Sequence, residues 1–291
     1  MPDSLSGSLA DRLSPAQREL VGEWLPDAEF VRDHSWGLIG TVVLEAVVGG
    51  DTVIIKAADE SDGHLARELR AHREWLGPWV AVDRAPRILH ADDEVKVLVT
   101  QFLPGELVQD RDAEHEPDTY RQAGALLELL HGQLEVVDEG YWRREQLSAL
   151  GWLDKPHRIE ADVEVRLRDI VKSWPTPASV VVPTHGDWQP RNWVIHDGVV
   201  SAIDFGRAAL RPAYTDFARL AAQQFLQDPR LEEAFLEGYG SDPRDPQGWQ
   251  RQRIREAVGT AVWAHQVGDV DFEAQGHRML AAALDDEGKL A

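Results

Sequence analysis

Short apolar runs and turns alternate over the first hundred residues. The segments TVVLEAVV and TVIIKAA flank the turn GGD, a pattern typical of a β-hairpin. Leu65, Leu69 and Leu76 follow at helical spacing, and a Gly-Pro pair ends that helix. Residues 86–90 and 95–102 offer two further strands, separated by an acidic turn. This part of the chain therefore predicts the order strand, strand, helix, strand, strand.

Helical spacing dominates after the segment LPGE. It begins in DTYRQAGALLELLHGQLEVV and returns in TDFARLAAQQFL, RLEEAFLEGYG and RIREAVGTAVWAHQVG. Between these helices, residues 178–206 contain three brief apolar runs, each with polar residues at its end. We therefore predict an α+β fold in two parts. Residues 1–103 would form a small antiparallel sheet with one key helix, and residues 104–291 a larger, mostly helical part.

Composition and charge limit the classes of partner that the protein can bind. The 291 residues are 43% apolar, enough for two cores, and 51 acids against 30 bases give a formal net charge of −21. This charge repels nucleic acid and anionic membranes. The sequence has no cysteine, no apolar run of the roughly 18 residues that a membrane span needs, and no basic or apolar leader at its start. We expect a cytoplasmic protein without nucleic-acid or membrane partners, and leave its oligomeric state open.

Three polar residues in and after the segment PTHGDWQPRNW suggest a functional site. Asp187, Asn192 and Asp204 each lie at the end of an apolar run, in a region that Gly and Pro keep from being a regular helix. One such Asp is usually a turn residue, but a set of three at strand ends favours a site. Carboxylate and amide oxygens are ligands that Mg²⁺ prefers, so Asn192 and Asp204 are candidate metal ligands. Asp187 stands apart and is free to meet a substrate hydroxyl.

The motif HGDWQPRN, followed by IDFG, resembles the catalytic loop and metal-binding motif of the aminoglycoside phosphotransferase family, relatives of the choline kinases and, more distantly, of protein kinases. The resemblance covers most of the chain, with its specific motifs within residues 183–207. It implies a two-lobed protein kinase-like fold with a nucleotide-binding lobe at residues 1–103 and a catalytic and substrate-binding lobe at residues 104–291. It also implies ATP- and Mg²⁺-dependent phosphoryl transfer to a small-molecule hydroxyl, with GTP open as an alternative donor.

The resemblance gives the polar residues of the motifs their roles. Asp187 would orient the acceptor hydroxyl and take its proton, while Asn192 and Asp204 would bind Mg²⁺. His185 would support the loop by hydrogen bonding, and general-base catalysis is its alternative role. Asp216, in YTDFARL, matches a family acid that braces the loop.

The nucleotide side is assigned in the same way. Lys56, in VIIKA, would contact the phosphates, and Glu68 would hold it, with Glu74 as the alternative partner. The backbones of Gln101 and Leu103, in VTQFLPGE, would bond the adenine edge.

The phosphate-covering loop departs from the protein-kinase pattern of three glycines. The segment HSWGLIGT has only two, so its phosphate contacts rest on Ser35, Gly37 and Gly40.

The acceptor is left open between several classes. Acids of the late helices could bind a cationic antibiotic, such as an aminoglycoside or a basic peptide, or an amino sugar; the candidates are Asp228, Glu232, Glu233, Glu237, Asp269, Asp271 and Glu273. Arg191, in the catalytic loop, is a further candidate contact. Aromatic faces at Trp188 and Trp263 could instead hold a choline-like amine or a neutral sugar. A catalytically silent nucleotide-binding protein is the remaining alternative.

Overall fold

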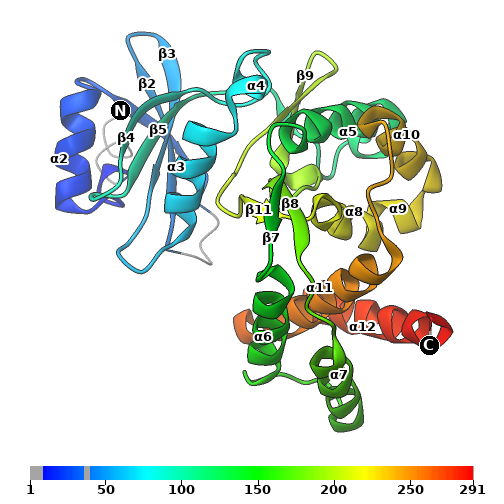
Figure 1. Cartoon of the computed structure of the whole chain (residues 1–291). Coiled ribbons are helices and arrows are strands. Elements are labelled where there is room, and N and C mark those ends of the chain that lie inside the picture. The colour runs from blue at the N-terminus through cyan, green and yellow to red at the C-terminus, as the bar shows by residue number, and fades with distance from the viewer. Residues whose placement is uncertain (1–8, 36–39, 291) are drawn as a thin grey trace.

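The computed structural model describes residues 9–35 and 40–290. Its first part is a five-stranded antiparallel sheet in the order β1-β2-β3-β5-β4 (Figure 1). The strands are β1 Glu29–Asp33, β2 Val42–Val48, β3 Asp51–Ala57, β4 Ile88–Asp92 and β5 Val97–Gln101. Gly49 and Gly50 join β2 to β3, and both have a positive φ, which glycine adopts without steric cost.

The two faces of this sheet are covered by different helices. Val53 and Ile55 of β3 point to one face and pack in a core with Val21 of α2 (Pro15–Trp24). The opposite face packs against α3 (His64–Glu74), whose Leu65 and Leu69 contact Leu98 of β5. Because side chains alternate along a strand, Lys56, the register partner of Leu98, projects toward α3. The alternation that buries β3 thus directs its lysine to the helix side.

The second part is mostly helical, with two three-stranded sheets in the orders β10-β9-β6 and β11-β8-β7. The short strands are β6 Glu106–Leu107, β7 Val136–Asp138, β8 Ser179–Thr184, β9 Trp193–His196, β10 Val199–Ala202 and β11 Ala209–Arg211. Helix α4, Gly77–Val80, belongs to the first part and lies between α3 and β4 in the chain. The helices of the second part are α5 Pro117–His131, α6 Tyr141–Leu153, α7 Ala161–Ser173, α8 Ala218–Ala222, α9 Gln224–Gln227, α10 Pro229–Tyr239, α11 Pro246–Val267 and α12 Val270–Leu290, with 3₁₀ turns η1 Asp112–His115, η2 Pro190–Asn192 and η3 Ala213–Phe217.

Helices α5 and α10 pack closely because both contribute glycine at the crossing. A Cβ on Gly124 would overlap the carbonyl oxygen of Phe235, and one on Gly238 would overlap that of Arg121. This pair encloses an aromatic core that includes Trp188, the residue after the catalytic-loop aspartate. The core therefore reaches directly under the loop that follows β8.

The observed architecture is the predicted α+β, kinase-like one: a small antiparallel sheet with a key helix, followed by a helical part (Figure 1). Two details differ. The sheet has β1 as an additional edge strand, whose alternate residues are too exposed to give a clear pattern. The Gly-Pro pair at positions 77 and 78 begins α4, after α3 has ended at Glu74. Within the described ranges, no helix combines the length and apolar character required to cross a membrane.

Candidate active site

A cavity of about 890 Å³ lies between the five-stranded sheet and the helical part. Its lining includes the side chains that the sequence nominated from both parts, namely Lys56, Glu68, Gln101, Leu103, Asn192 and Asp204. Residues distant in the sequence therefore meet at one cleft.

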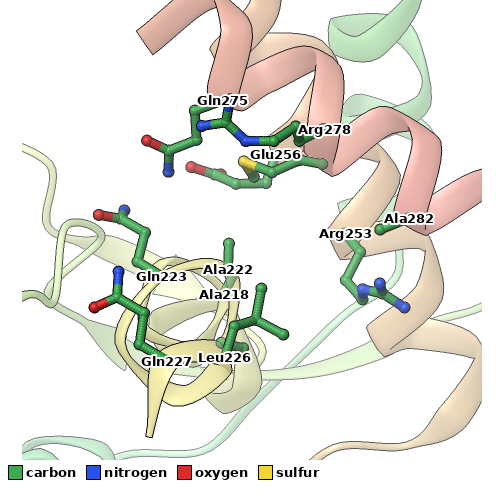
Figure 2. Close-up of a pocket in the computed structure, with 12 residues that line it drawn as sticks. Ala218, Ala222, Gln223, Leu226, Gln227, Arg253, Glu256, Gln275, Arg278 and Ala282 are labelled. Carbon is green, nitrogen blue, oxygen red and sulfur yellow. The ribbon is translucent and has the colours of Figure 1, made fainter. Parts of the chain in front are cut away.

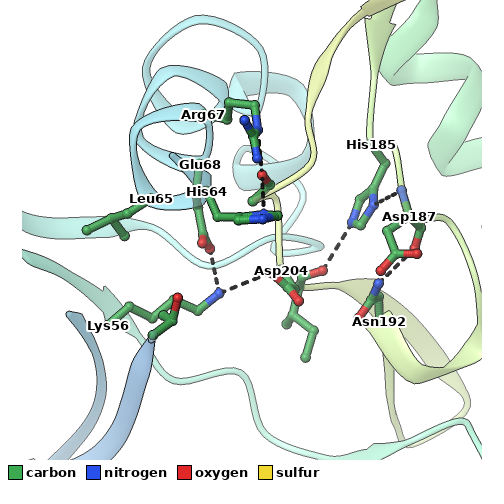
Figure 3. A network of polar contacts seen from close by, with 12 residues as sticks. Lys56, His64, Leu65, Arg67, Glu68, His185, Asp187, Asn192 and Asp204 are labelled. Carbon is green, nitrogen blue, oxygen red and sulfur yellow. Dashed lines mark hydrogen bonds and ion pairs between the residues drawn. The ribbon is translucent and has the colours of Figure 1, made fainter. Parts of the chain in front are cut away.

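Lys56 is the charge at the centre of this cleft. Its Nζ lies 2.7 Å from Glu68 Oε1 and 3.6 Å from Asp204 Oδ1 (Figure 3). Burial alone would lower the pKa of Lys56, but the carboxylates of Glu68 and Asp204 raise it, so the ammonium stays charged. Glu74, the alternative partner, instead pairs with Arg70 on the exposed side of α3.

Helix α3 is fastened to the IDFG segment. Arg67 Nε donates a hydrogen bond of 2.8 Å to the carbonyl of Gly206, and His64 Nδ1 lies 3.1 Å from the same oxygen (Figure 3). Because Glu68 belongs to this helix, these contacts fix the Lys56–Glu68 pair relative to Asp204. The nucleotide side of the site is therefore assembled across both parts of the fold.

The catalytic loop leaves β8 through a turn that requires glycine. Gly186 has φ +80°, and a Cβ there would overlap the backbone carbonyl of Arg207. Asp216 of η3 accepts hydrogen bonds from the backbone N–H of His185, at 2.8 Å, and of Gly186, at 2.6 Å. A third contact comes from His131 of α5, whose Nε2 lies 3.2 Å from Asp216. Asp216 thus holds the loop's two turn amides, the bracing position expected for it.

His185 is enclosed within the loop. Its Nδ1 accepts a 3.3 Å hydrogen bond from Asp187 N, and its Nε2 lies 3.1 Å from the carbonyl of Ile203 (Figure 3). The ring packs against Trp188 and Phe205 and has no exposed surface. Both nitrogens are therefore engaged in joining the loop to the IDFG segment, which favours the supporting role over general-base catalysis.

Asp187 lies in a nest of cationic and amide donors. Its Oδ1 accepts from Gln189 Nε2 at 2.6 Å and pairs with Arg219 Nε at 2.9 Å, while Oδ2 accepts from Arg191 Nη2 at 2.7 Å. The residue is only 5% exposed. Burial alone would raise the pKa of Asp187, but the charges of Arg219 and Arg191 outweigh it and hold the pKa below its ordinary value. The carboxylate therefore stays ionised at neutral pH.

Asn192 and Asp204 fit a magnesium–nucleotide complex. Asn192 Nδ2 donates to the carbonyl of Asp187 at 2.7 Å, which leaves the amide oxygen for a cation. The Asp204 side chain is 55% exposed, and Lys56 lowers the pKa of this carboxyl. No cluster of three or more His, Cys, Asp or Glu able to enclose a metal ion occurs among residues 9–35 and 40–290. One carboxylate and one amide suit Mg²⁺, which takes its other ligands from phosphate oxygens and water.

Family comparison agrees with this geometry. The sequence model of the phosphotransferase enzyme family matches residues 34–254. The chain belongs to the phosphotransferase enzyme family. No curated protein matches it in sequence.

Solved structures share the fold of this phosphotransferase at low sequence identity. A thermostable mutant of the aminoglycoside phosphotransferase APH(4)-Ia, in a ternary complex with ADP and hygromycin B, has a TM-score of 0.67 at 13% identity, covering 94% of this chain and 98% of that one. Choline kinase LicA from Streptococcus pneumoniae has a TM-score of 0.66 at 14% identity, covering 92% and 97%. A choline/ethanolamine kinase family protein from Mesorhizobium loti has a TM-score of 0.63 at 19% identity, covering 97% and 94%.

The segment after β5 offers backbone groups to a nucleotide base. The N–H of Gln101 already donates to the carbonyl of Arg87, at 2.9 Å, so the group that Gln101 can offer the cavity is its carbonyl. The N–H of Leu103 has no hydrogen-bond partner within the described part of the chain. A carbonyl acceptor and an N–H donor two residues apart match the paired groups on an adenine edge.

The glycine-poor loop is only partly placed at the site. Gly37 lies outside the described residues. Ser35 is occupied within the sheet, where its hydroxyl accepts from Val43 N at 2.9 Å and its own N–H donates to Asp33 at 2.8 Å. Gly40 lines a separate hollow beside Asp59. Neither Ser35 nor Gly40 is brought to the cleft cavity.

The tryptophans expected to meet a substrate lie elsewhere. Trp188 is 1% exposed and packs against Trp79 and Trp193 in the core, so the expectation that its face holds a ligand is wrong. The neighbouring motif residues turn toward the cleft while this side chain anchors the loop from below. Trp263 of α11 packs against Phe272 of α12. It lines neither the cleft cavity nor a smaller cavity between α8–α9 and α11–α12.

The acids proposed for a cationic acceptor are engaged in local contacts. Asp228 caps α10 and pairs with Arg230, and Glu232 pairs with Arg244. Asp269 accepts from the N–H of Phe272 at the start of α12. None of the seven candidate acids lines the cleft cavity or the smaller cavity between α8–α9 and α11–α12.

Sequence reasoning missed the residues that surround Asp187 from the helical side. A second cavity, of about 390 Å³, lies between α8–α9 and α11–α12 (Figure 2), and Glu256 of α11 lines it. Glu256 Oε1 lies 3.1 Å from Arg219 Nη2, and Arg219 in turn pairs with Asp187. One guanidinium thus joins the loop carboxylate to this cavity. Arg219 belongs to a segment read only for its helical spacing, and nothing in that spacing indicates its partners.

Proposed function

We propose that the protein transfers the γ-phosphoryl group of Mg·ATP to a hydroxyl group of a small molecule. The observation that supports this is the convergence of Asn192 and Asp204 with the Lys56–Glu68 pair at one cleft, with Asp187 joined to Asn192 by a hydrogen bond to its backbone carbonyl. Family membership supports the reaction class. Solved relatives in complexes with ADP support adenine-nucleotide binding, and GTP is a competing donor for the same test.

In this reaction the acceptor oxygen forms a bond to the γ-phosphorus while the bond from that phosphorus to the β,γ-bridging oxygen breaks, releasing ADP. The hydroxyl becomes acidic as its oxygen bonds phosphorus, so its proton moves to Asp187 late, and a carboxylate with a low pKa suffices. The Lys56 ammonium neutralises phosphate charge. Bound Mg²⁺, held by Asn192 and Asp204, would add further neutralisation. The donors around Asp187 hold its carboxylate in a fixed position, and the carboxylate thereby orients the hydroxyl.

Solved relatives indicate the size of acceptor that this fold accommodates. One contains hygromycin B, another is a spectinomycin phosphotransferase in complex with spectinomycin, and a third is a choline kinase. These names support a small-molecule acceptor for this chain. The acceptors to be tested are therefore cationic antibiotics, choline-like amines and sugars. An antibiotic as acceptor would indicate a role in resistance, and an amine or a sugar a role in metabolism.

The test is an ATP-consumption assay with Mg²⁺ against aminoglycosides, basic peptides, macrolides, choline-like amines, sugars and sugar acids. Asp187→Asn should lower turnover of any accepted compound by about 100-fold or more, because it removes the proton acceptor. Binding of AMP-PNP should be unchanged, since Asp187 is not among the nucleotide contacts.

Two results would contradict the proposal. If Asp187→Asn kept more than about a tenth of the activity, Asp187 would not be the base. If the wild-type protein bound Mg·ATP tightly but transferred to no compound, it would be a silent nucleotide-binding protein.

A further inference from the structure

The acceptor side of the site differs in charge from the molecule as a whole. The chain has a formal net charge of −21, yet arginine is concentrated on the helical side of Asp187. Arg191 and Arg219 pair with its carboxylate, and Arg207 lies close enough to influence its pKa. A strongly acidic protein that gathers three cations around one carboxylate has a locally basic site.

The second cavity continues this basic character. Its polar lining consists of Gln223, Gln227, Arg253, Glu256, Gln275 and Arg278. Figure 2 shows Gln275 and Arg278 on one helix pair and Gln223 and Gln227 on the other, while the end of the Arg253 side chain turns away from the space between them. Glu256 is the cavity's one acid among the described residues, and it is already neutralised by Arg219 and Arg255. Amide groups suit hydroxyls. Because Arg253 pairs with Asp286, the charge that remains at the lining is that of Arg278.

One of the cavity's two arginines is available to a ligand. Arg253 is paired with Asp286, at 2.6 Å. The guanidinium group of Arg278 has no hydrogen-bond or ion-pair partner in the part of the chain that the structure describes, and its side chain is exposed at the cavity lining. An oxyanion brought to Arg278 forms a charge-assisted hydrogen bond without displacing a protein partner.

A cationic acceptor fits this cavity poorly. Asp228, Glu232 and Asp269 are committed to helix caps and ion pairs outside it, and an amine placed inside would face the guanidinium of Arg278. Like charges in a partly enclosed site repel strongly.

We infer that the acceptor bears a carboxylate or phosphate group in addition to its reacting hydroxyl, and that Arg278 binds this group in the cavity between α8–α9 and α11–α12. The inference rests on the proposed function, because it names the acceptor class of the same reaction. The Asp187–Arg219–Glu256 contacts place this cavity beside the proposed base.

The first test is ligand binding without turnover. The wild-type protein, saturated with Mg²⁺ and AMP-PNP so that the nucleotide site is filled, is screened by thermal shift against three pools. These are hydroxy acids with sugar phosphates, neutral polyols, and amino sugars with aminoglycosides. The anionic pool should stabilise the protein most, and its separate members distinguish carboxylate from phosphate. Larger stabilisation by the amine or neutral pool, or none by the anionic pool at millimolar concentration, would overturn the inference.

Variants then locate the binding group. Arg278→Gln should weaken the binding of the best anionic compound about tenfold by calorimetry, which corresponds to the loss of one charge-assisted hydrogen bond. Arg230→Gln, which removes an exposed arginine paired with Asp228 on α10, is the matched control and should leave affinity unchanged. Equal affinity in Arg278→Gln and in the wild-type protein would overturn the inference.

The affinity of each variant for AMP-PNP separates the two proposals. If the nucleotide binds and an amine is phosphorylated, phosphoryl transfer stands and the anionic acceptor is wrong. If the nucleotide does not bind the wild-type protein, the proposed function itself fails.

Discussion

His72 is a partly buried histidine that stays neutral beside the cleft. Its Nε2 has no hydrogen-bond partner within the described ranges, and its ring packs edge-on against Phe205 at a centroid distance of 5.3 Å. Burial, assisted by the charge of Lys56, lowers the pKa of His72 to about 3. Between that value and the ordinary pKa near 6.5, the unfolded chain binds the proton and the folded one does not. Stability therefore falls as pH decreases through this window.

Replacement His72→Phe tests this sign. The free energy of unfolding should decrease less between pH 7 and pH 5 in the variant, by up to roughly 2 kcal/mol, because the titrating group is gone. Chemical denaturation at several pH values measures the difference. His196→Phe, at an exposed histidine, is the control and should keep the wild-type slope. Identical slopes for His72→Phe and wild type would show that His72 is protonated in the folded protein.

Residues within the motifs could be nominated from the sequence because their spacing fixes them on one loop. Asn192 and Asp204 line one cavity as expected, and Asn192 donates a hydrogen bond to the backbone carbonyl of Asp187. Trp188 was misjudged, since adjacency to a motif does not tell which way a side chain points. Arg219 and Glu256 were missed because each resembles an ordinary charge on a helix, and only tertiary packing makes them partners of Asp187.

Among the elements, the contact between η3 and the catalytic loop has the largest effect on the site. Asp216 accepts from two buried backbone amides, so Asp216→Asn leaves one of them facing an NH₂ group. The free energy of unfolding should fall by about 1–3 kcal/mol at pH 7, and kcat should fall because the loop loses its brace. Asp118→Asn, at an exposed acid of α5, should change stability by less than about 0.5 kcal/mol.

The pH dependence of this variant has a defined sign. Burial alone would raise the pKa of Asp216, but His131 and the loop amides lower it below the ordinary value. The stabilisation is therefore present above the unfolded pKa of about 3.9 and is lost as pH falls below it. The gap between Asp216→Asn and wild type should shrink on acidification. A gap that is constant with pH would mean that Asp216 acts through shape alone.

Elements with strong periodicity were predictable, and short exposed ones were not. The β2–β3 hairpin follows from two apolar runs around a Gly-Gly turn, and α3 follows from its leucine spacing. β1, β6 and β7 are short and largely exposed, so no alternation marks them. Their pairing depends on partners far along the chain, and local sequence does not encode it.

For the whole molecule, the cleft between the two parts predicts nucleotide-linked stability. Mg²⁺ with AMP-PNP at a hundred times its Kd should stabilise the wild-type protein by about 2.7 kcal/mol, raising Tm by several degrees. Lys56→Met should lose most of this increase, because the phosphates lose their cation and Glu68 is left without its partner. Lys172→Met, on α7, is the control. An equal increase in Lys56→Met would place the nucleotide away from this lysine.

Global properties of the chain were predictable only as averages. The division into a sheet part and a helical part follows from the change in periodicity. The net charge argues against a nucleic-acid partner and suggests a cationic acceptor. The described residues that line the cavity between α8–α9 and α11–α12 nevertheless include two arginines and one acid. A sum over 291 residues does not report where its few positive charges gather.

Asp187 is one end of a line of alternating charges that runs through Arg219, Glu256 and Arg255 to Glu145 on α6. Every interior member has a neighbour of opposite sign on each side, so one replacement removes a partner from two buried charges at once. A change of acceptor that alters the cavity between α8–α9 and α11–α12 therefore proceeds by compensating pairs of substitutions. A mutational search that changes one position at a time would find that these positions do not tolerate substitution, whereas a library that varies neighbouring positions together would find that they do.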